Sequence, residues 1–410
     1  MKTNYHLLSV FAVALLFQAC TVKRPNTVAV VQQEPKIDVT AVKIKLQDKQ
    51  TYAFEKEAVF FSNDFPSARL NDLSKVNDST FNMIIEAENR PINSSAWFAF
   101  KIWGRPNKNV YVNLHYPSDK HRYQPKITTD GQQWDTLDEV KVNKEKTEAS
   151  FRVKLSKDTL TVAAQEIISS GQSYQWMDKL VKNYSLNKTV IGYSIGGKPV
   201  IALNSTKSDG KKAVVILSRQ HPPEISGYMA MEQFVETLLG NTILAKNFIK
   251  NYEVIIIPMI NPDGVDEGNW RHSFAGVDLN RDWIDFKQPE TRAVRDYLLE
   301  KVRKQGTKVY FALDFHSTYN DVLYTNEDRP DTNRPGLTNA WIKGLHDFEG
   351  TNKTTVKPSG NGGNVSKAWL GKVLNAEALT YEVGDNTPRQ YIKQKATKVA
   401  QVLMTELLKN

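Results

Sequence analysis

The chain of 410 residues contains a single cysteine, Cys20, so no disulfide can form within it. After the first residues it has no apolar run that approaches the ~20 residues a membrane-spanning helix requires. Internal repeats, dense runs of one charge and nucleic-acid-binding motifs are also missing. We therefore interpret the net charge of +9 as a solvated basic surface and expect no nucleic-acid partner. Attraction to an acidic substrate or an anionic envelope surface is the alternative interpretation.

The N-terminus has the pattern of an export signal. Lys2 precedes a short apolar run, Leu7 to Phe17, and a small residue precedes Cys20. The ending Leu-Phe-Gln-Ala-Cys resembles a bacterial lipoprotein signal, in which the cysteine is acylated and becomes the new N-terminus. We expect residues 1–20 to be the signal, and the protein to be exported and held at a periplasm-facing membrane through the lipid on Cys20 alone. An ordinary cleaved signal with an incidental cysteine is the alternative.

The next part of the chain changes from a linker to a β-rich pattern. Residues 21–45 are polar and aperiodic, which is typical of a tether. Residues 46–165 contain short alternating runs between turn signals, which predicts an all-β sandwich domain. The clearest runs are Trp97–Trp103, Val110–Leu114 and Ala149–Leu155.

From Tyr174 onward apolar runs alternate with segments of helical length, so residues 170–410 are predicted to form an α/β domain. The expected strands are Ala213–Leu217, Val254–Ile260, Val309–Phe315 and Ala378–Val383. The expected helices are Glu224–Leu239, Glu290–Val302 and a long one from about Arg389.

Potential metal ligands follow two of the predicted strands. His221 and Glu224, spaced H-x-x-E, let an imidazole and a carboxylate face one cation, although most such pairs are surface residues. His316 ends another strand, where a lone histidine is more often part of the core. Because active sites gather beyond the carboxyl ends of strands, we expect the three to meet. Three protein ligands with a fourth position for water are typical of catalytic zinc.

Two further groups lie at strand ends. The string from Asn261 to Arg271, followed by Asp278 to Arg281, brings two arginines and an asparagine near the same crevice. The planar guanidinium matches a carboxylate, so this string favours carboxylate recognition. Glu382 ends the last strand among apolar neighbours, as suits a general base with a raised pKa. In isolation such a glutamate is usually a solvated edge residue.

Together these motifs resemble the M14 zinc carboxypeptidases, the family of carboxypeptidase A, from about Ser173 to the C-terminus. The resemblance implies a central mixed, twisted sheet flanked by helices. It also implies one Zn²⁺ per chain, bound by His221, Glu224 and His316.

The same resemblance implies roles for other residues. Arg271 would polarise the scissile carbonyl, and Asn280 and Arg281 would hold the substrate's terminal carboxylate. Asp278 would orient a zinc-binding histidine, and Glu382 would take the proton from the metal-activated water. The expected function is therefore a zinc metallocarboxypeptidase that acts on the C-termini of peptides or proteins.

The segments Trp97–Phe100 and Gly131–Trp134, with the string that ends at Arg271, are similar to the cytosolic carboxypeptidases. Members of that branch remove glutamates from protein tails. In the family, a residue shortly before the base helps to set the pocket for the leaving side chain. Counting back from Glu382 reaches Lys367, whose charge would favour an acidic residue. A solvated surface lysine is the alternative.

The sequence departs from the family at one functional position, and it leaves two alternative functions possible. Digestive members use a mobile tyrosine before the base, but this chain has none between Thr325 and Thr380. Trp369 and His346 are the candidates for its role. An envelope enzyme of this type is alternatively a peptidoglycan stem-peptide carboxypeptidase. In another functional class, the chain is an inactive carboxypeptidase-like binding module.

Overall fold

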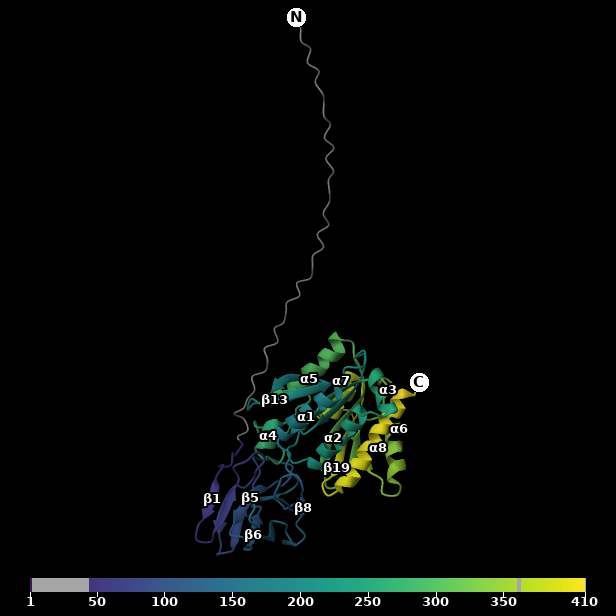
Figure 1. Cartoon of the computed structure of the whole chain (residues 1–410). Helices are drawn as coiled ribbons and strands as arrows, with labels where there is room; N and C mark the ends of the chain where they lie inside the picture. Colours follow the sequence, from purple (N-terminus) through teal and green to yellow (C-terminus); the bar gives the residue numbers. More distant parts are fainter. Residues whose placement is uncertain (2–43, 360–362, 410) are drawn as a thin grey trace. The chain divides into compact units, whose positions relative to one another are not determined.

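The computed structural model describes Met1 and residues 44–359 and 363–409. Cys20, the predicted signal apart from Met1, and nearly all of the predicted tether lie outside these residues. The described residues from 44 onward form one structural unit, which contains every element described below (Figure 1). Among the described helices, none has both the length and the apolar character needed to cross a membrane.

The N-terminal region contains two sheets, in which all strand pairs are antiparallel except β4 with β6. In spatial order, the first sheet consists of β1 (Thr51–Phe54), β2 (Val59–Ser62), β5 (Ala99–Gly104), β11 (Leu160–Ala163), β7 (Lys126–Thr128) and β8 (Asp135–Thr136). The second consists of β3 (Asp72–Lys75), β4 (Thr80–Ile84), β6 (Asn109–His115), β10 (Glu148–Lys154) and β9 (Val140–Val142).

The inner faces of these two sheets share one apolar core. Alternate residues of β10 are buried, as its period-two sequence pattern predicts. The rings of Phe61 in β2 and Phe81 in β4 lie 4.9 Å apart, so the two sheets contact each other directly. The same core includes Trp270 from the C-terminal region. The two regions are therefore joined by buried apolar contacts.

The C-terminal region is built on a mixed sheet of eight strands. Their spatial order is β12 (Asn187–Tyr193), β13 (Pro199–Asn204), β15 (Glu253–Ile257), β14 (Lys212–Ser218), β16 (Lys308–Thr318), β19 (Glu377–Gly384), β17 (Val322–Thr325) and β18 (Thr355–Pro358). The central strands β15, β14, β16 and β19 are parallel, so their carboxyl ends lie at one edge. The predicted strand Val254–Ile260 is shorter as observed, because Pro258 cannot donate to the ladder.

Helices cover both faces of this sheet. Alternate residues of β14 point to opposite faces, with Val214 and Ile216 in one core and Val215 and Leu217 in the other. The first core is completed by α1 (Ser170–Tyr184), α2 (Ile225–Leu239), α3 (Ile243–Asn251), α6 (Leu337–Glu349) and α8 (Arg389–Leu408). The second is completed by α5 (Pro289–Leu299) and α7 (Ser366–Leu374). The short helix α4 (Pro262–Asp266) follows β15. This is the predicted α/β architecture (Figure 1).

Candidate active site

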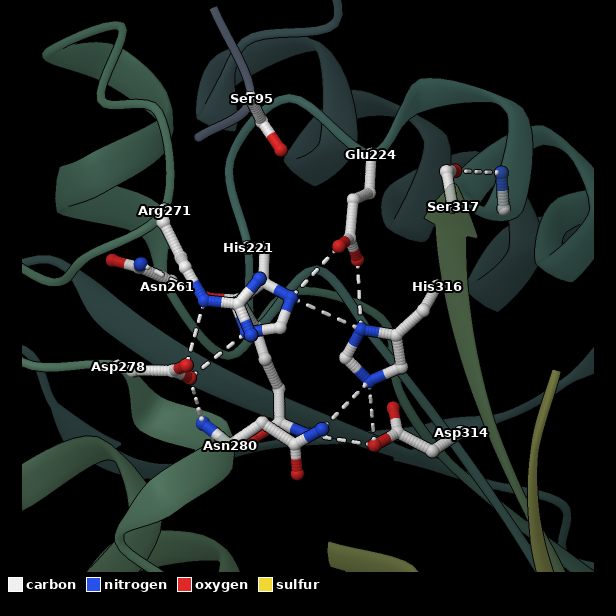
Figure 2. A network of polar contacts seen from close by, with 12 residues as sticks. Ser95, His221, Glu224, Asn261, Arg271, Asp278, Asn280, Asp314, His316 and Ser317 are labelled. Atoms are coloured by element: carbon white, nitrogen blue, oxygen red, sulfur yellow. Dashed lines mark hydrogen bonds and ion pairs between the residues drawn. The ribbon is translucent and has the colours of Figure 1, made fainter. Parts of the chain in front are cut away.

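Two histidines and a glutamate converge at the carboxyl edge of the central strands. His221 and Glu224 lie in the turn between β14 and α2, and His316 lies near the end of β16. All three are buried, and their ligand atoms lie within 4.8 Å of one another. The carboxylate of Glu224 bridges the rings, with Oε1 2.8 Å from Nδ1 of His221 and Oε2 2.7 Å from Nδ1 of His316 (Figure 2).

The other nitrogen of each ring contacts an aspartate. His221 Nε2 lies 2.9 Å from Oδ1 of Asp278, and His316 Nε2 lies 2.9 Å from Oδ2 of Asp314. Such carboxylates fix the ring orientation and tautomer. Burial alone would raise the pKa of the Glu224 carboxyl, but the two imidazoles outweigh burial and hold it well below its ordinary value. Burial alone would lower the pKa of the His316 imidazole, but the carboxylates of Asp314 and Glu224 outweigh burial and raise it. The site is therefore built around opposite charges.

Zinc fits this donor set. The two Nδ1 atoms lie only 3.2 Å apart and share the Glu224 carboxylate, while each Nε2 faces another carboxylate. Each ring can therefore donate through Nε2 and direct the Nδ1 lone pair inward. Two imidazole nitrogens and one carboxylate are a typical protein ligand set of catalytic zinc. His221, Glu224 and His316 thus meet as the sequence predicts and could hold one such ion.

The sequence motifs gave Asp314 no role, yet it is central to the site. It is fully buried, and its Oδ2 also accepts hydrogen bonds from Gln220 Nε2, at 2.6 Å, and from Ser366 Oγ. The signal was available, because residues two apart on a strand point to the same face. Asp314 and His316 have this spacing on β16.

Close packing between α2 and β16 sets the position of His316. Gly227, in the first turn of α2, lies so near β16 that a Cβ atom there would be 2.1 Å from the carbonyl oxygen of His316. The backbone N–H of Gly227 also donates to Ser317 Oγ at 2.8 Å. Any larger residue would therefore push the helix away from the strand that carries the ligand.

Asp278 connects the metal-ligand cluster to Arg271. Its Oδ2 accepts from Arg271 Nε at 2.7 Å, while Oδ1 contacts His221 (Figure 2). Burial would raise the pKa of the Asp278 carboxyl, but His221 and then Arg271 hold it well below its ordinary value. Arg271 and Asp278 lie in the long connection after β15. Asn261 caps the first turn of this connection, where its Oδ1 accepts from the backbone N–H of Gly264 at 3.0 Å. The predicted contact between Asp278 and His221 is present.

Asn280 and Arg281 lie in a 3₁₀ turn after Asp278. Asn280 Oδ1 accepts from the backbone N–H of Ser366 at 2.9 Å, and Nδ2 lies 3.5 Å from His316 Nε2. Arg281 is exposed and donates through Nη1 to its neighbour's carbonyl at 2.8 Å. The asparagine is therefore fixed at the metal-ligand cluster, while the arginine reaches toward solvent.

Glu382 has the environment expected of a general base. It pairs with His316 across β16 and β19, and its Oε2 is buried without a hydrogen-bond partner among the residues that the structure describes. Burial, with a smaller contribution from the Glu224 carboxylate, raises the pKa of Glu382 to about 7, against the opposing effects of His316, His221 and Arg271. A buried carboxylate oxygen with an open acceptor position can accept a proton from a bound molecule.

A cleft of about 860 Å³ contains these groups. Of the predicted residues, it is lined by His221, Glu224, Arg271, Asn280, Arg281, Lys367 and Glu382. Lys367 is buried and donates from Nζ to Asn326 Oδ1 at 2.9 Å. Burial lowers the pKa of its ammonium to about 8. Lys367 is thus part of the cleft and is not the solvated surface lysine of the alternative interpretation.

The candidates for the tyrosine role do not lie in the cleft. Trp369 packs in the core against other aromatic rings, and His346 Nε2 lies 3.0 Å from a backbone carbonyl oxygen after α6. Among the described residues, the tyrosines that line the cleft are Tyr319, in the turn between β16 and β17, and Tyr324, within β17. Both precede Thr325, where the segment expected to contain the mobile tyrosine begins.

The N-terminal region supplies one wall of the cleft, which the motifs did not indicate. Its lining residues there include Ser94, Ser95, Lys120 and Arg122. Arg122 donates from Nε to Asp385 Oδ2 at 2.8 Å and from Nη1 to Ser95 Oγ at 2.7 Å. Sequence reasoning missed these residues because no motif links them to the strand ends.

Comparisons of the sequence point to one family. The sequence profile of the zinc carboxypeptidases matches residues 173–399. Cytosolic carboxypeptidase 3 of Bos taurus is 32% identical over 132 residues, which cover 32% of this chain and 13% of that protein. Cytosolic carboxypeptidase 2 of Homo sapiens is 38% identical over 140 residues, which cover 32% of this chain and 16% of that protein. The chain thus matches less than a fifth of the length of either relative.

Solved structures share the fold. A metallo-carboxypeptidase from Burkholderia cenocepacia has a TM-score of 0.70 and 19% identity, and the match covers 86% of this chain and 98% of that one. A metallo-carboxypeptidase from Pseudomonas aeruginosa has a TM-score of 0.68 and 19% identity, and the match covers 85% and 98%. At such identities the likeness establishes the fold.

Proposed function

The chain belongs to the zinc carboxypeptidase family, and on that premise we propose that it removes the C-terminal residue from peptides or proteins. One observation carries this proposal. Glu382, on the strand beside His316, has a buried carboxylate oxygen with no hydrogen-bond partner in the described part of the chain, and it lines a cleft with Arg271, Asn280 and Arg281. A proton acceptor, a metal-ligand set and carboxylate-binding groups thus share one cavity, as hydrolysis at a chain end requires.

His221, Glu224 and His316 would hold one zinc ion. When bound, zinc supplies a Lewis acid that makes water a stronger acid and polarises a carbonyl group. The Asp278 and Asp314 carboxylates keep both imidazoles oriented for this task. The inactive-module alternative loses support, because the complete ligand set and the proton acceptor are present in one cleft.

Side chains of the protein bind the substrate, stabilise the developing negative charge and transfer the proton. Arg281, with Asn280 beside it, binds the terminal carboxylate, because a guanidinium can form two parallel hydrogen bonds with it. Arg271 donates to the scissile carbonyl oxygen as negative charge develops there. Glu382 accepts a proton from the attacking water and delivers it to the leaving amine.

An acidic C-terminal residue fits this cleft best. The lining includes the cations Lys120, Arg122, Arg271, Arg281 and Lys367. Of these, Lys367 and Arg271 are buried, and the contact of Lys367 Nζ with Asn326 holds the lysine ammonium in place. Attraction between a lysine and a substrate carboxylate is strengthened where water is excluded.

Matched peptides test the proposal. One peptide is offered with a C-terminal glutamate, a second with leucine, and a third with the glutamate amidated at its α-carboxyl group. We expect the first to lose its last residue fastest and the amidated peptide to resist cleavage, as followed by mass spectrometry. Equal cleavage of the amidated peptide, or cleavage within the chain, would reject carboxypeptidase activity.

A further inference from the structure

A buried glutamate of the N-terminal region binds the loop that carries Arg271. Glu88 follows β4 and is fully buried. Its Oε2 accepts from the backbone N–H of Trp270 at 2.8 Å. Its Oε1 accepts from the next two N–H groups, those of Arg271 at 3.0 Å and His272 at 2.7 Å. One carboxylate thus satisfies three consecutive amides 182 to 184 residues away in the sequence.

Such a contact fixes the backbone direction on both sides of Arg271. Hydrogen bonds to an ionised carboxylate are stronger than neutral ones, and a buried N–H without a partner costs free energy. Neighbouring contacts hold the same loop to the N-terminal region. Trp270 Nε1 donates to Trp97 O at 2.9 Å, and Asn89 Nδ2 donates to Gly276 O at 2.9 Å. The loop therefore takes its conformation from a different region of the chain.

The Arg271 side chain continues from this anchored backbone to the metal-ligand cluster. Its Nε donates to Asp278, which contacts His221 on its other oxygen (Figure 2). Glu88 lies two contacts from Asp278 along this chain and does not line the catalytic cleft. Any effect of Glu88 on catalysis must therefore pass through the residues that it holds.

We propose that Glu88 is a positioning residue for Arg271, so that the N-terminal region completes the active site. This inference rests on the proposed function, because it requires Arg271 to act on the substrate. The competing explanation is that Glu88 only compensates a buried charge, since the guanidinium of Arg69 lies 3.5 Å from it and is also buried. The two explanations differ in whether the length of the side chain matters.

The experiment uses Glu88→Asp in the full chain. Aspartate keeps the negative charge beside Arg69, but its shorter side chain cannot reach all three amides. We expect kcat to fall by about tenfold to a hundredfold with KM and zinc content nearly unchanged, since small misplacements of a catalytic group have effects of this size. Glu86→Gln is the matched control, because Glu86 is two residues away on the surface, paired with Lys45, and should keep full activity.

A double-mutant cycle with Arg271→Ala separates positioning from general damage. If Glu88 acts through Arg271, Glu88→Asp should cause little further loss in the Arg271→Ala protein. Equal losses in both backgrounds, or full activity of Glu88→Asp, would overturn the inference. If that variant is poorly folded, Glu88→Gln, which keeps the side-chain length and removes the charge, is put through the same cycle: a loss confined to the protein with Arg271 supports the inference, and equal losses in both backgrounds overturn it. A wild-type protein without carboxypeptidase activity would instead contradict the proposed function.

Discussion

His316 and Glu382 occupy paired positions on the neighbouring parallel strands β16 and β19. Side chains at paired positions of adjacent strands point to the same face of a sheet. A candidate metal ligand and a candidate base are thus placed side by side by backbone hydrogen bonds alone. Their relation is rigid, because both strands lie in the centre of the eight-stranded sheet.

The aspartates behind the two histidines should control zinc affinity. We expect Asp278→Asn and Asp314→Asn each to weaken zinc binding by roughly 10- to 100-fold, because the amide cannot orient the imidazole as the carboxylate does. Competition with a chromogenic chelator measures this directly. Asp285→Asn is the control, since Asp285 is exposed and contacts Lys287. Unchanged affinity in both Asp278→Asn and Asp314→Asn would refute the orienting role.

Lys367 should select acidic C-terminal residues. Replacing it with methionine keeps the length and removes the charge, so kcat/KM for a glutamate-terminated peptide should fall. The loss of transition-state stabilisation should be about 1–3 kcal/mol, as expected for a lost charge-assisted contact. The leucine-terminated peptide should be almost unaffected. Lys372→Met, on the exposed side of the same helix, is the control. An equal loss for both peptides would show that Lys367 supports the fold and does not set specificity.

The acidic preference should also depend on pH. The pKa of Lys367 is lowered to about 8 by burial, so its ammonium is charged below that pH and neutral above it. The ratio of kcat/KM for glutamate over leucine should therefore be highest below pH 8 and decrease as the pH rises through 8. In Lys367→Met the ratio should lack this step. A ratio that is flat between pH 7 and 9 in the wild type contradicts the assignment.

Membrane attachment is a separate prediction, which rests on residues outside those the structure describes. Cys20→Ser should move the protein from the membrane fraction to the soluble fraction, because stable anchoring requires lipid chains on that cysteine. Fractionation of producing cells followed by immunoblotting measures the shift. An unchanged membrane fraction would mean that the protein is held by another anchor.

The sequence predicted the central strands because their burial on both faces leaves continuous apolar runs, as in β14 and β15. It also predicted that His221, Glu224 and His316 would meet, since each follows or ends such a strand. Helix α1 was missed, although Ser169 and Gln172 form a capping box at its start.

Contacts that join distant parts of the chain could not be predicted in this way. Glu88 and Arg271 are 183 residues apart, and neither residue belongs to a local pattern that names the other. The same is true of Arg122 and Asp385, which are 263 residues apart at the wall of the cleft. These pairs depend on how the two regions pack, which periodicity and motif spacing do not specify.

The most direct test of the central claim is the Glu382→Gln variant, with zinc content and peptide cleavage measured on the same sample. Glutamine has nearly the same shape as glutamate but cannot accept the proton from the attacking water. We predict about one zinc per chain in both proteins, as a His, Glu, His set binds one ion. The wild type should release the C-terminal residue, and the variant should release almost none. Near-wild-type turnover by the zinc-loaded variant would contradict the account.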